Sequence, residues 1–116
     1  MADRTRFRLQ DIVEAIDQIS ALLKTKTLDD VMRDRVLRAA FERFLEILSE
    51  ASRSISDELK ATAPQIPWQR VGDIGNHLRH AYHRVDAEIL WNIYANGELA
   101  TLRQVIVQFL QSKYLR

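Results

Sequence analysis

Residues 37–55 read LRAAFERFLEILSEASRSI, and the spacing of their apolar residues decides the fold class. Apolar side chains recur every three or four positions, which is the period of an amphipathic helix and not of a strand. One side of this helix carries Leu37, Phe41, Phe44, Leu48, Ala51 and Ile55. We expect the helix to begin near Asp29 and to run to about Leu59, either unbroken or with a break in Ser52–Ser56.

The segments on both sides of this stretch repeat the helical period. The first segment ends at the polar turn 24–27 and has one apolar stripe, made of Leu9, Ile12, Val13, Ile16, Ile19 and Leu23. After the second helix comes ATAPQIPW, residues 61–68, where proline forbids continuation of a helix. We expect Trp68 to plug one end of the bundle.

Three more helices are predicted after Trp68. The third covers Gln69 to about His83, and the fourth begins at Asp86, a good N-cap, and closes at Asn96-Gly97 with a left-handed C-cap. The last runs from Glu98 to about Tyr114, with its inward side formed by Leu99, Leu102, Val105, Ile106, Phe109 and Leu110. Short connections make neighbouring helices antiparallel, so we predict an all-α, up-and-down antiparallel helical bundle that forms one domain over residues 1–116.

Composition agrees with one ordinary globular domain. The chain has 116 residues, of which 47% are hydrophobic and 28% charged, and its net charge of +1 is too small to indicate nucleic-acid binding by itself. The absence of cysteine excludes disulfides and thiolate metal sites. Charges interrupt every apolar run near the start, so we expect a cytoplasmic protein with no signal peptide and no membrane segment.

The second helix has an additional apolar flank, formed by Val36, Ala40 and Ile47. This flank is wider than one contact between two helices requires. It is covered either by deeper burial in the monomer or by a second copy of the chain in a homodimer.

All three histidines, His77, His80 and His83, lie within seven residues. Arg70, Arg79 and Arg84 lie nearby, against the single acid Asp73, so a small positive patch is expected and an anion such as phosphate is a plausible guest. Arg70, His77 and His83 are therefore candidate substrate-binding residues. The alternative is that the histidines only form a solvated helix face.

A helix turns by about 100° per residue, which divides the histidine helix into two faces. The apolar face comprises Val71, Ile74, Leu78, Ala81 and Val85. Asn76, His80 and His83 lie near the opposite side, with Asn76 and His80 one turn apart, and these polar groups face either solvent or a groove between two protomers. Tyr82 lies near the apolar face, and its position is typical of a core-edge tyrosine with its hydroxyl at the rim.

Three kinds of chemistry are open to this cluster. Histidines three positions apart need a third metal ligand that the sequence does not indicate, so we predict neither a metal nor another cofactor. A nucleophilic triad lacks both a serine elbow and a cysteine. The third is acid-base cleavage of a phosphodiester, in which histidine takes the proton of a ribose 2′-hydroxyl and arginine holds the phosphate.

The stretch IPWQRVGDIGNHLRHAYHRVDAEILWNI, residues 66–93, resembles the HepT-like branch of the HEPN (higher eukaryotes and prokaryotes nucleotide-binding) domains. The matching positions, in order, are Pro67-Trp68, Asn76, His80, Tyr82, Val85-Asp86 and Trp91. The earlier FLEILSEASRSIS resembles the family's second helix, with Glu50-Ala51 and the basic residue Arg53. The resemblance covers nearly the whole chain.

The resemblance implies a helical bundle that forms a homodimer, with the histidine helices of both protomers lining a shared groove. It implies a metal-independent endoribonuclease that acts on RNA as the toxin of a bacterial toxin-antitoxin pair. The implied antitoxin is a small nucleotidyltransferase that silences the toxin by transferring AMP to the motif tyrosine, here Tyr82.

The chain departs from the family pattern at Gly75, where the family has arginine. Helical side chains lean toward the N-terminus, so Arg79 is expected to reach back over this place, with Arg70 as the other candidate. A glycine inside a helix also predicts a close approach by another backbone or a ligand. Two functions follow: a ribonuclease with His80, Arg79 and Asn76 as catalytic residues, or a non-catalytic dimeric module that binds a nucleotidyltransferase or nucleic acid.

Overall fold

The computed structural model describes residues 2–79 and 84–112, and all regular structure in these ranges is helical. The elements are α1 (Ala2–Leu23), α2 (Leu28–Arg33), α3 (Arg35–Arg53), α4 (Asp57–Ala61), α5 (Trp68–Gly72), α6 (Ile74–Leu78), α7 (Arg84–Ala95) and α8 (Glu98–Gln111). The all-α prediction is confirmed. In these ranges no helix combines the length and the apolar character that crossing a membrane requires.

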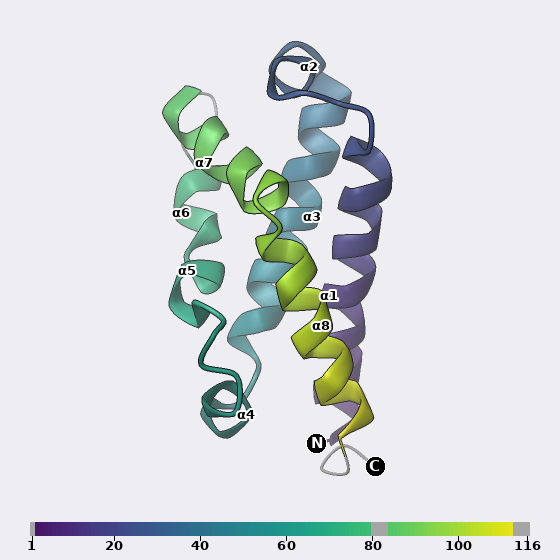
Figure 1. Cartoon of the computed structure of the whole chain (residues 1–116), viewed down its shortest axis with the longest axis vertical. Helices are drawn as coiled ribbons and strands as arrows, with labels where there is room; N and C mark the ends of the chain where they lie inside the picture. Colours follow the sequence, from purple (N-terminus) through teal and green to yellow (C-terminus); the bar gives the residue numbers. More distant parts are fainter. Residues whose placement is uncertain (1, 80–83, 113–116) are drawn as a thin grey trace.

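The helices form four limbs that alternate in direction (Figure 1). The chain rises through α1, descends through α3, rises again through α5 and α6, and descends through α7 and α8 (Figure 1). The first limb packs against α3 and α8, and α3 also packs against α5 and α6. The predicted up-and-down arrangement is therefore observed, and α3 is the limb that joins the two halves.

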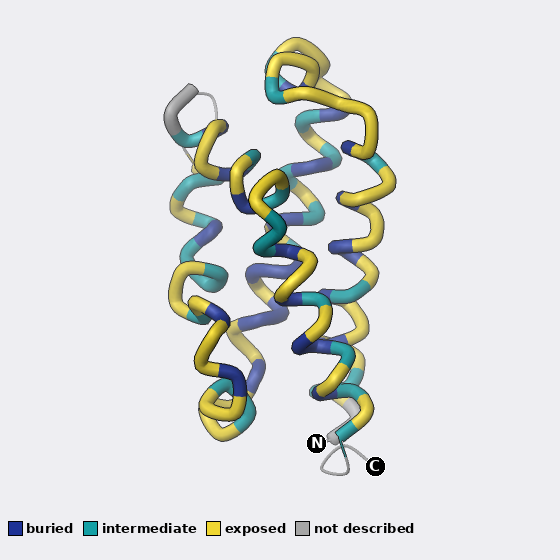
Figure 2. Tube along the Cα trace, in the orientation of Figure 1, coloured by how far each residue is buried: buried dark blue, intermediate teal, exposed yellow. Residues whose placement is uncertain are grey.

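The core lies along the inner sides of α1, α3 and α8 (Figure 2). The predicted stripes of α1 and α8 are buried, apart from the half-buried Val13 and Leu110. On α3 the prediction was wrong at one position, because Leu45 is fully buried whereas Phe44 is only half-buried. Since α3 is covered by α1 on one side and by α5 and α6 on another, its buried face is wider than one stripe.

The predicted second helix is three helices. Asp34 has an extended backbone and its carboxylate accepts the N–H groups of Val36 and Leu37, at 3.0 and 3.1 Å, so α3 begins after it. A capping box of Thr27 and Asp30 starts α2, and the backbone N–H of Thr27 lowers the pKa of Asp30. The break considered in Ser52–Ser56 is confirmed, since α3 ends at Arg53 and α4 begins after Ser56.

The predicted third helix, from Gln69 to about His83, is wrong as a continuous element. It is interrupted at Asp73, which separates α5 from α6. The N–H of Asn76 donates to Asp73 O at 2.9 Å instead of to Gly72 O, the partner that an unbroken helix would use. The interruption therefore frees the carbonyl of Gly72.

Two boundaries of the last limb differ from prediction and one agrees. Asp86 is not the N-cap, because α7 begins at Arg84 and places Asp86 inside its first turn. Gly97 has φ of 81°, so the predicted left-handed residue between α7 and α8 is confirmed. The last helix ends at Gln111, before the predicted Tyr114, which lies outside the described residues.

Trp68 closes the end of the bundle where the connection between α4 and α5 meets α8. Its ring stacks on Phe109 with centroids 6.1 Å apart. Its indole N–H donates to Lys60 O and Ala63 O, both at 3.1 Å. This contact confirms the predicted role of Trp68 as a plug.

We expect Gly97→Ala to lower the free energy of unfolding by about 1–2 kcal/mol, because a side chain in the left-handed conformation costs that much. Gly75→Ala is the matched control, since Gly75 has no positive φ and a Cβ there would meet no other atom of the described chain within 4 Å. Urea unfolding of both variants measures the difference. A loss in Gly97→Ala no larger than that in Gly75→Ala would contradict the expectation.

Candidate functional site

A groove of about 500 Å³ lies between α3 and the limb formed by α5 and α6. The side lined by α3 consists of Glu42, Arg43, Glu46, Ser49, Glu50 and Arg53. The opposite side consists of Gly72, Gly75, Leu78 and Arg79. Two residues singled out in the sequence, Gly75 and Arg79, therefore lie on one wall of a cleft.

Arg79 reaches back along its helix toward Asn76. It follows the last residue of α6, and its Nη2 donates to the side-chain oxygen of Asn76. Both side chains are exposed. The structure thus brings together two of the three predicted catalytic residues, with Arg79 extended in the direction expected from helix geometry.

Gly75 faces open space in the groove. A Cβ built on it meets no atom within 4 Å among the described residues, apart from its own helix backbone and chain neighbours. The predicted close approach by another backbone is therefore not found among the described residues. A β-carbon at position 75 would therefore enter space that no other described residue occupies.

The junction of α5 and α6 is fixed by two side chains of α3. Ser49 Oγ donates to Val71 O at 2.8 Å and to Gly72 O at 3.2 Å. Arg53 donates to Gly72 O through Nε at 3.0 Å and through Nη2 at 2.8 Å. Ser49 was not predicted as a site residue, although a serine between the apolar Leu48 and Ala51 on the core side of the helix indicates a buried polar contact.

His77 lies on the side of α6 that faces α7. Its Nδ1 is 3.0 Å from Oδ1 of Asp86, and both side chains are partly buried. His77 is not among the residues that line the groove. The structure therefore separates this predicted substrate-binding residue from Arg79 and shows that it ties α6 to α7.

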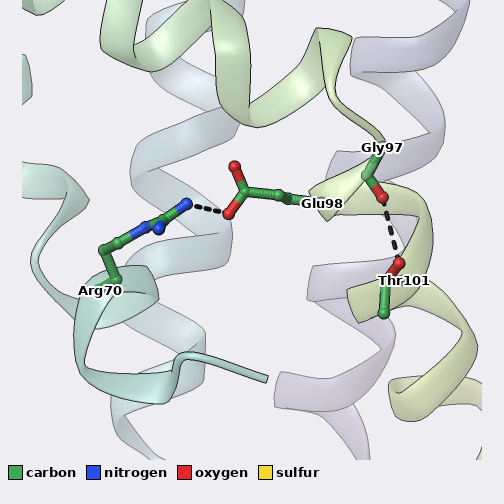
Figure 3. Close-up of polar contacts among 4 residues, drawn as sticks. All are labelled: Arg70, Gly97, Glu98 and Thr101. Carbon is green, nitrogen blue, oxygen red and sulfur yellow. Dashed lines mark hydrogen bonds and ion pairs between the residues drawn. The ribbon is translucent and has the colours of Figure 1, made fainter. Parts of the chain in front are cut away.

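Arg70 also lies outside the groove. Its guanidinium forms an ion pair with Glu98, the first residue of α8 (Figure 3). In the same turn of α8, Thr101 Oγ1 donates to Gly97 O at 3.2 Å (Figure 3). Arg70 therefore joins α5 to α8, and Arg79 is the candidate that lies beside Gly75.

The remaining predicted site residues are His80, Tyr82 and His83. All three lie outside the described residues. Their roles in proton transfer, AMP acceptance and substrate binding stay predictions.

The charges of the groove are not all neutralised. Arg38 binds Glu42 at 3.0 Å, and Arg43 binds Glu46, so these carboxylates have cationic partners. Arg53 and Arg79 instead bind neutral oxygens, of a backbone carbonyl and an amide. Arg53 and Arg79 thus both line the groove that contains Gly75, with Glu50 as the other acid on the groove wall.

Comparison with known proteins places this arrangement in a family. The model of the family described as ribonuclease HepT-like matches residues 12–109. The chain belongs to the HepT-like ribonuclease family. The match includes α3, α5 and α6, so the groove lies within the part of the chain that defines it as a HepT-like protein.

Relatives of this HepT-like chain carry ribonuclease names. A Thermococcus cleftensis protein with the name Probable ribonuclease HepT is 37% identical over 83 residues, covering 72% of this chain and 76% of the relative. A Methanocaldococcus jannaschii protein, provisionally named an RNase, is 32% identical over 85 residues, covering 73% of this chain and 78% of the relative. A protein from Caldanaerobacter subterraneus, also provisionally named an RNase, is 27% identical over 105 residues, and the match covers 90% of this chain and 93% of the relative. No solved structure matches the chain significantly.

Proposed function

We propose that this HepT-like chain is an endoribonuclease that cleaves RNA without a metal ion. The observation that carries the proposal is the contact between Arg79 and Asn76 beside the groove, in a chain of a family described as ribonuclease. Arginine is suited to hold a phosphate through parallel hydrogen bonds. The neutral partner of Arg79 leaves its charge available for that task.

In the proposed reaction His80 accepts the proton of a ribose 2′-hydroxyl while O2′ attacks phosphorus. The bond from phosphorus to O5′ breaks as the bond from O2′ to phosphorus forms, which gives a 2′,3′-cyclic phosphate, and O5′ takes a proton from water to leave as a hydroxyl. Arg79 binds the non-bridging phosphate oxygens, and Asn76 orients Arg79 through its side-chain oxygen. His80 therefore carries out the proton transfer, and Arg79 on the groove wall binds the phosphate.

A second function is favoured by one observation, the glycine at position 75. In this alternative the chain is a dimeric HEPN module that binds a nucleotidyltransferase or nucleic acid without cutting it. Incubation of purified protein with labelled single-stranded RNA in EDTA distinguishes the two. Cleavage by the wild type supports the nuclease, whereas binding without cleavage, together with cleavage by Gly75→Arg, supports the non-catalytic module.

The proposed biological setting is a toxin-antitoxin pair with a minimal nucleotidyltransferase as antitoxin. Induction of this chain alone in bacteria is expected to stop growth, and co-expression of the nucleotidyltransferase is expected to restore it. A chain carrying His80→Ala is the control for toxicity that does not depend on cleavage.

Tyr82 is the proposed acceptor of AMP. We expect a gain in mass equal to AMP when the protein is incubated with ATP and a co-purified nucleotidyltransferase, because the resemblance implies transfer of AMP to this tyrosine. The added anion would compete with RNA phosphate for Arg79. Intact-mass spectrometry measures the gain, and Tyr82→Phe is the control. An unchanged mass, or a gain that persists in Tyr82→Phe, would exclude Tyr82 as the acceptor.

A homodimer built on the second helix and the histidine helix is the proposed assembly. Val36 is 80% exposed on α3, and Ala40 and Ile47 are half-buried on the same helix. We expect a dimer by sedimentation at about tens of micromolar, a range in which weak interfaces still associate. Val36→Glu should shift it to monomer, while Phe7→Glu on α1 should not. A monomeric wild type would overturn the shared-groove arrangement.

A further inference from the structure

The carbonyl of Gly72 is held in an unusual way. It is freed from the helix ladder by the break at Asp73, and it accepts hydrogen bonds from three N–H and O–H donors of α3. Two of these donors belong to the guanidinium of Arg53. The break between α5 and α6 and the orientation of Arg53 therefore depend on the same contact.

The contact fixes only part of the Arg53 guanidinium. An arginine has five N–H donors in a planar fork, and the bonds to Gly72 O use one on Nε and one on Nη2. The remaining donors belong to an exposed side chain that lines the groove. Because the acceptor is a neutral carbonyl, this contact does not pair the positive charge of Arg53 with an acid.

Arg53 and Gly75 line the same groove, on opposite walls. Arg53 projects from α3, while Gly75 and Arg79 lie on the limb of α6. The space over Gly75 is free of described protein atoms within 4 Å. An anion in this groove would have an arginine side chain on each wall.

We propose that Arg53 binds an RNA phosphate in this groove, together with Arg79, and so replaces the arginine that is missing at position 75. The assignment rests on the proposed function for the identity of the ligand as RNA. Anchoring by Gly72 O lowers the entropy that Arg53 loses when it binds, because the fork is already oriented. Arg53 thus has two roles: it binds the phosphate, and it stabilises the junction of α5 and α6.

The salt dependence of RNA binding tests the assignment. The probe is a 2′-O-methyl single-stranded oligonucleotide, which cannot be cleaved through O2′, and fluorescence anisotropy gives its affinity at several salt concentrations. We expect Arg53→Gln to weaken binding about tenfold at low salt, as for the loss of a charged hydrogen bond. The slope of log K against log salt should become less negative by about 0.7, the value for one phosphate contact on a single strand.

Three variants separate the binding contact from a purely structural role. Ser49→Ala removes a hydrogen bond to the same Gly72 carbonyl without changing charge, so its slope should equal that of the wild type. Arg53→Lys keeps the charge and should keep the slope. Arg103→Gln removes the same charge from α8, where Arg103 binds Asp17 at 2.7 Å, and should leave the slope unchanged.

The outcomes also separate this assignment from the proposed nuclease activity. An unchanged slope in Arg53→Gln, or weakening equal to that in Ser49→Ala, would overturn the phosphate contact, as would failure of the wild type to bind the oligonucleotide. A slope that depends on Arg53 in a protein that cuts no RNA would support the contact and contradict the nuclease. Circular dichroism of each variant identifies any loss of helix.

Discussion

His80→Ala is expected to lower the rate of RNA cleavage by about 100-fold to 10,000-fold, the usual contribution of a general acid or base. The motivating observation is the retained order of Asn76, His80 and Tyr82 in a HepT-like chain. Single-turnover cleavage of labelled RNA in EDTA measures the rate of the chemical step. The loss should be in that rate and not in the affinity for a 2′-O-methyl oligonucleotide.

His77→Ala is the matched control for this experiment. It removes an imidazole from the same short stretch, but His77 contacts Asp86 and does not line the groove. We therefore expect a much smaller loss of cleavage rate. Equal losses in His77→Ala and His80→Ala would contradict a specific acid-base role for His80, and full activity in His80→Ala would remove that role altogether.

Arg79→Ala is expected to lower cleavage by about tenfold to 100-fold, because a hydrogen bond to a charged group contributes about 1.5–3 kcal/mol. In this background Gly75→Arg should restore activity, since position 75 lines the same groove and a Cβ there meets no other described residue within 4 Å. Gly75→Ala should not restore it, because alanine brings no charge. Steady-state cleavage of the single and double variants measures the rescue.

Full activity in Arg79→Ala would show that the missing arginine is not replaced by Arg79. Failure of Gly75→Arg to rescue a damaged Arg79→Ala enzyme would show that position 75 no longer faces the reacting phosphate. The affinity of Arg79→Ala for the 2′-O-methyl oligonucleotide can be compared directly with that of Arg53→Gln. Together they apportion phosphate binding between the two walls of the groove.

The parts of the fold that depend on local pattern could be predicted from the sequence. The stripes of α1 and α8 follow from helical period alone, and Gly97 follows from the left-handed residue that a tight connection needs. The break at Asp73 could not be predicted in this way. It is stabilised by Arg53, which lies 19 positions before Gly72 in the chain and meets its carbonyl only after α3 and α5 have packed.

The same division applies to the candidate site. The backward reach of Arg79 follows from the lean of side chains on any helix, and it is observed. The contact between His77 and Asp86 depends on how α7 packs against α6, so the sequence indicated Asp86 as a helix cap instead. Ser49 was missed because its acceptors, Val71 O and Gly72 O, belong to another limb.

Ser49 and Arg53 are one turn apart on α3, and this spacing limits how the gene can change. One inserted or deleted codon between them would rotate one side chain relative to the other by about 100° and shift it by about 1.5 Å. The side chains of Ser49 and Arg53 could then no longer contact the carbonyl of Gly72 at the same time. Length variation among natural variants should therefore be absent between positions 49 and 53 and tolerated in the exposed turn at 24–27.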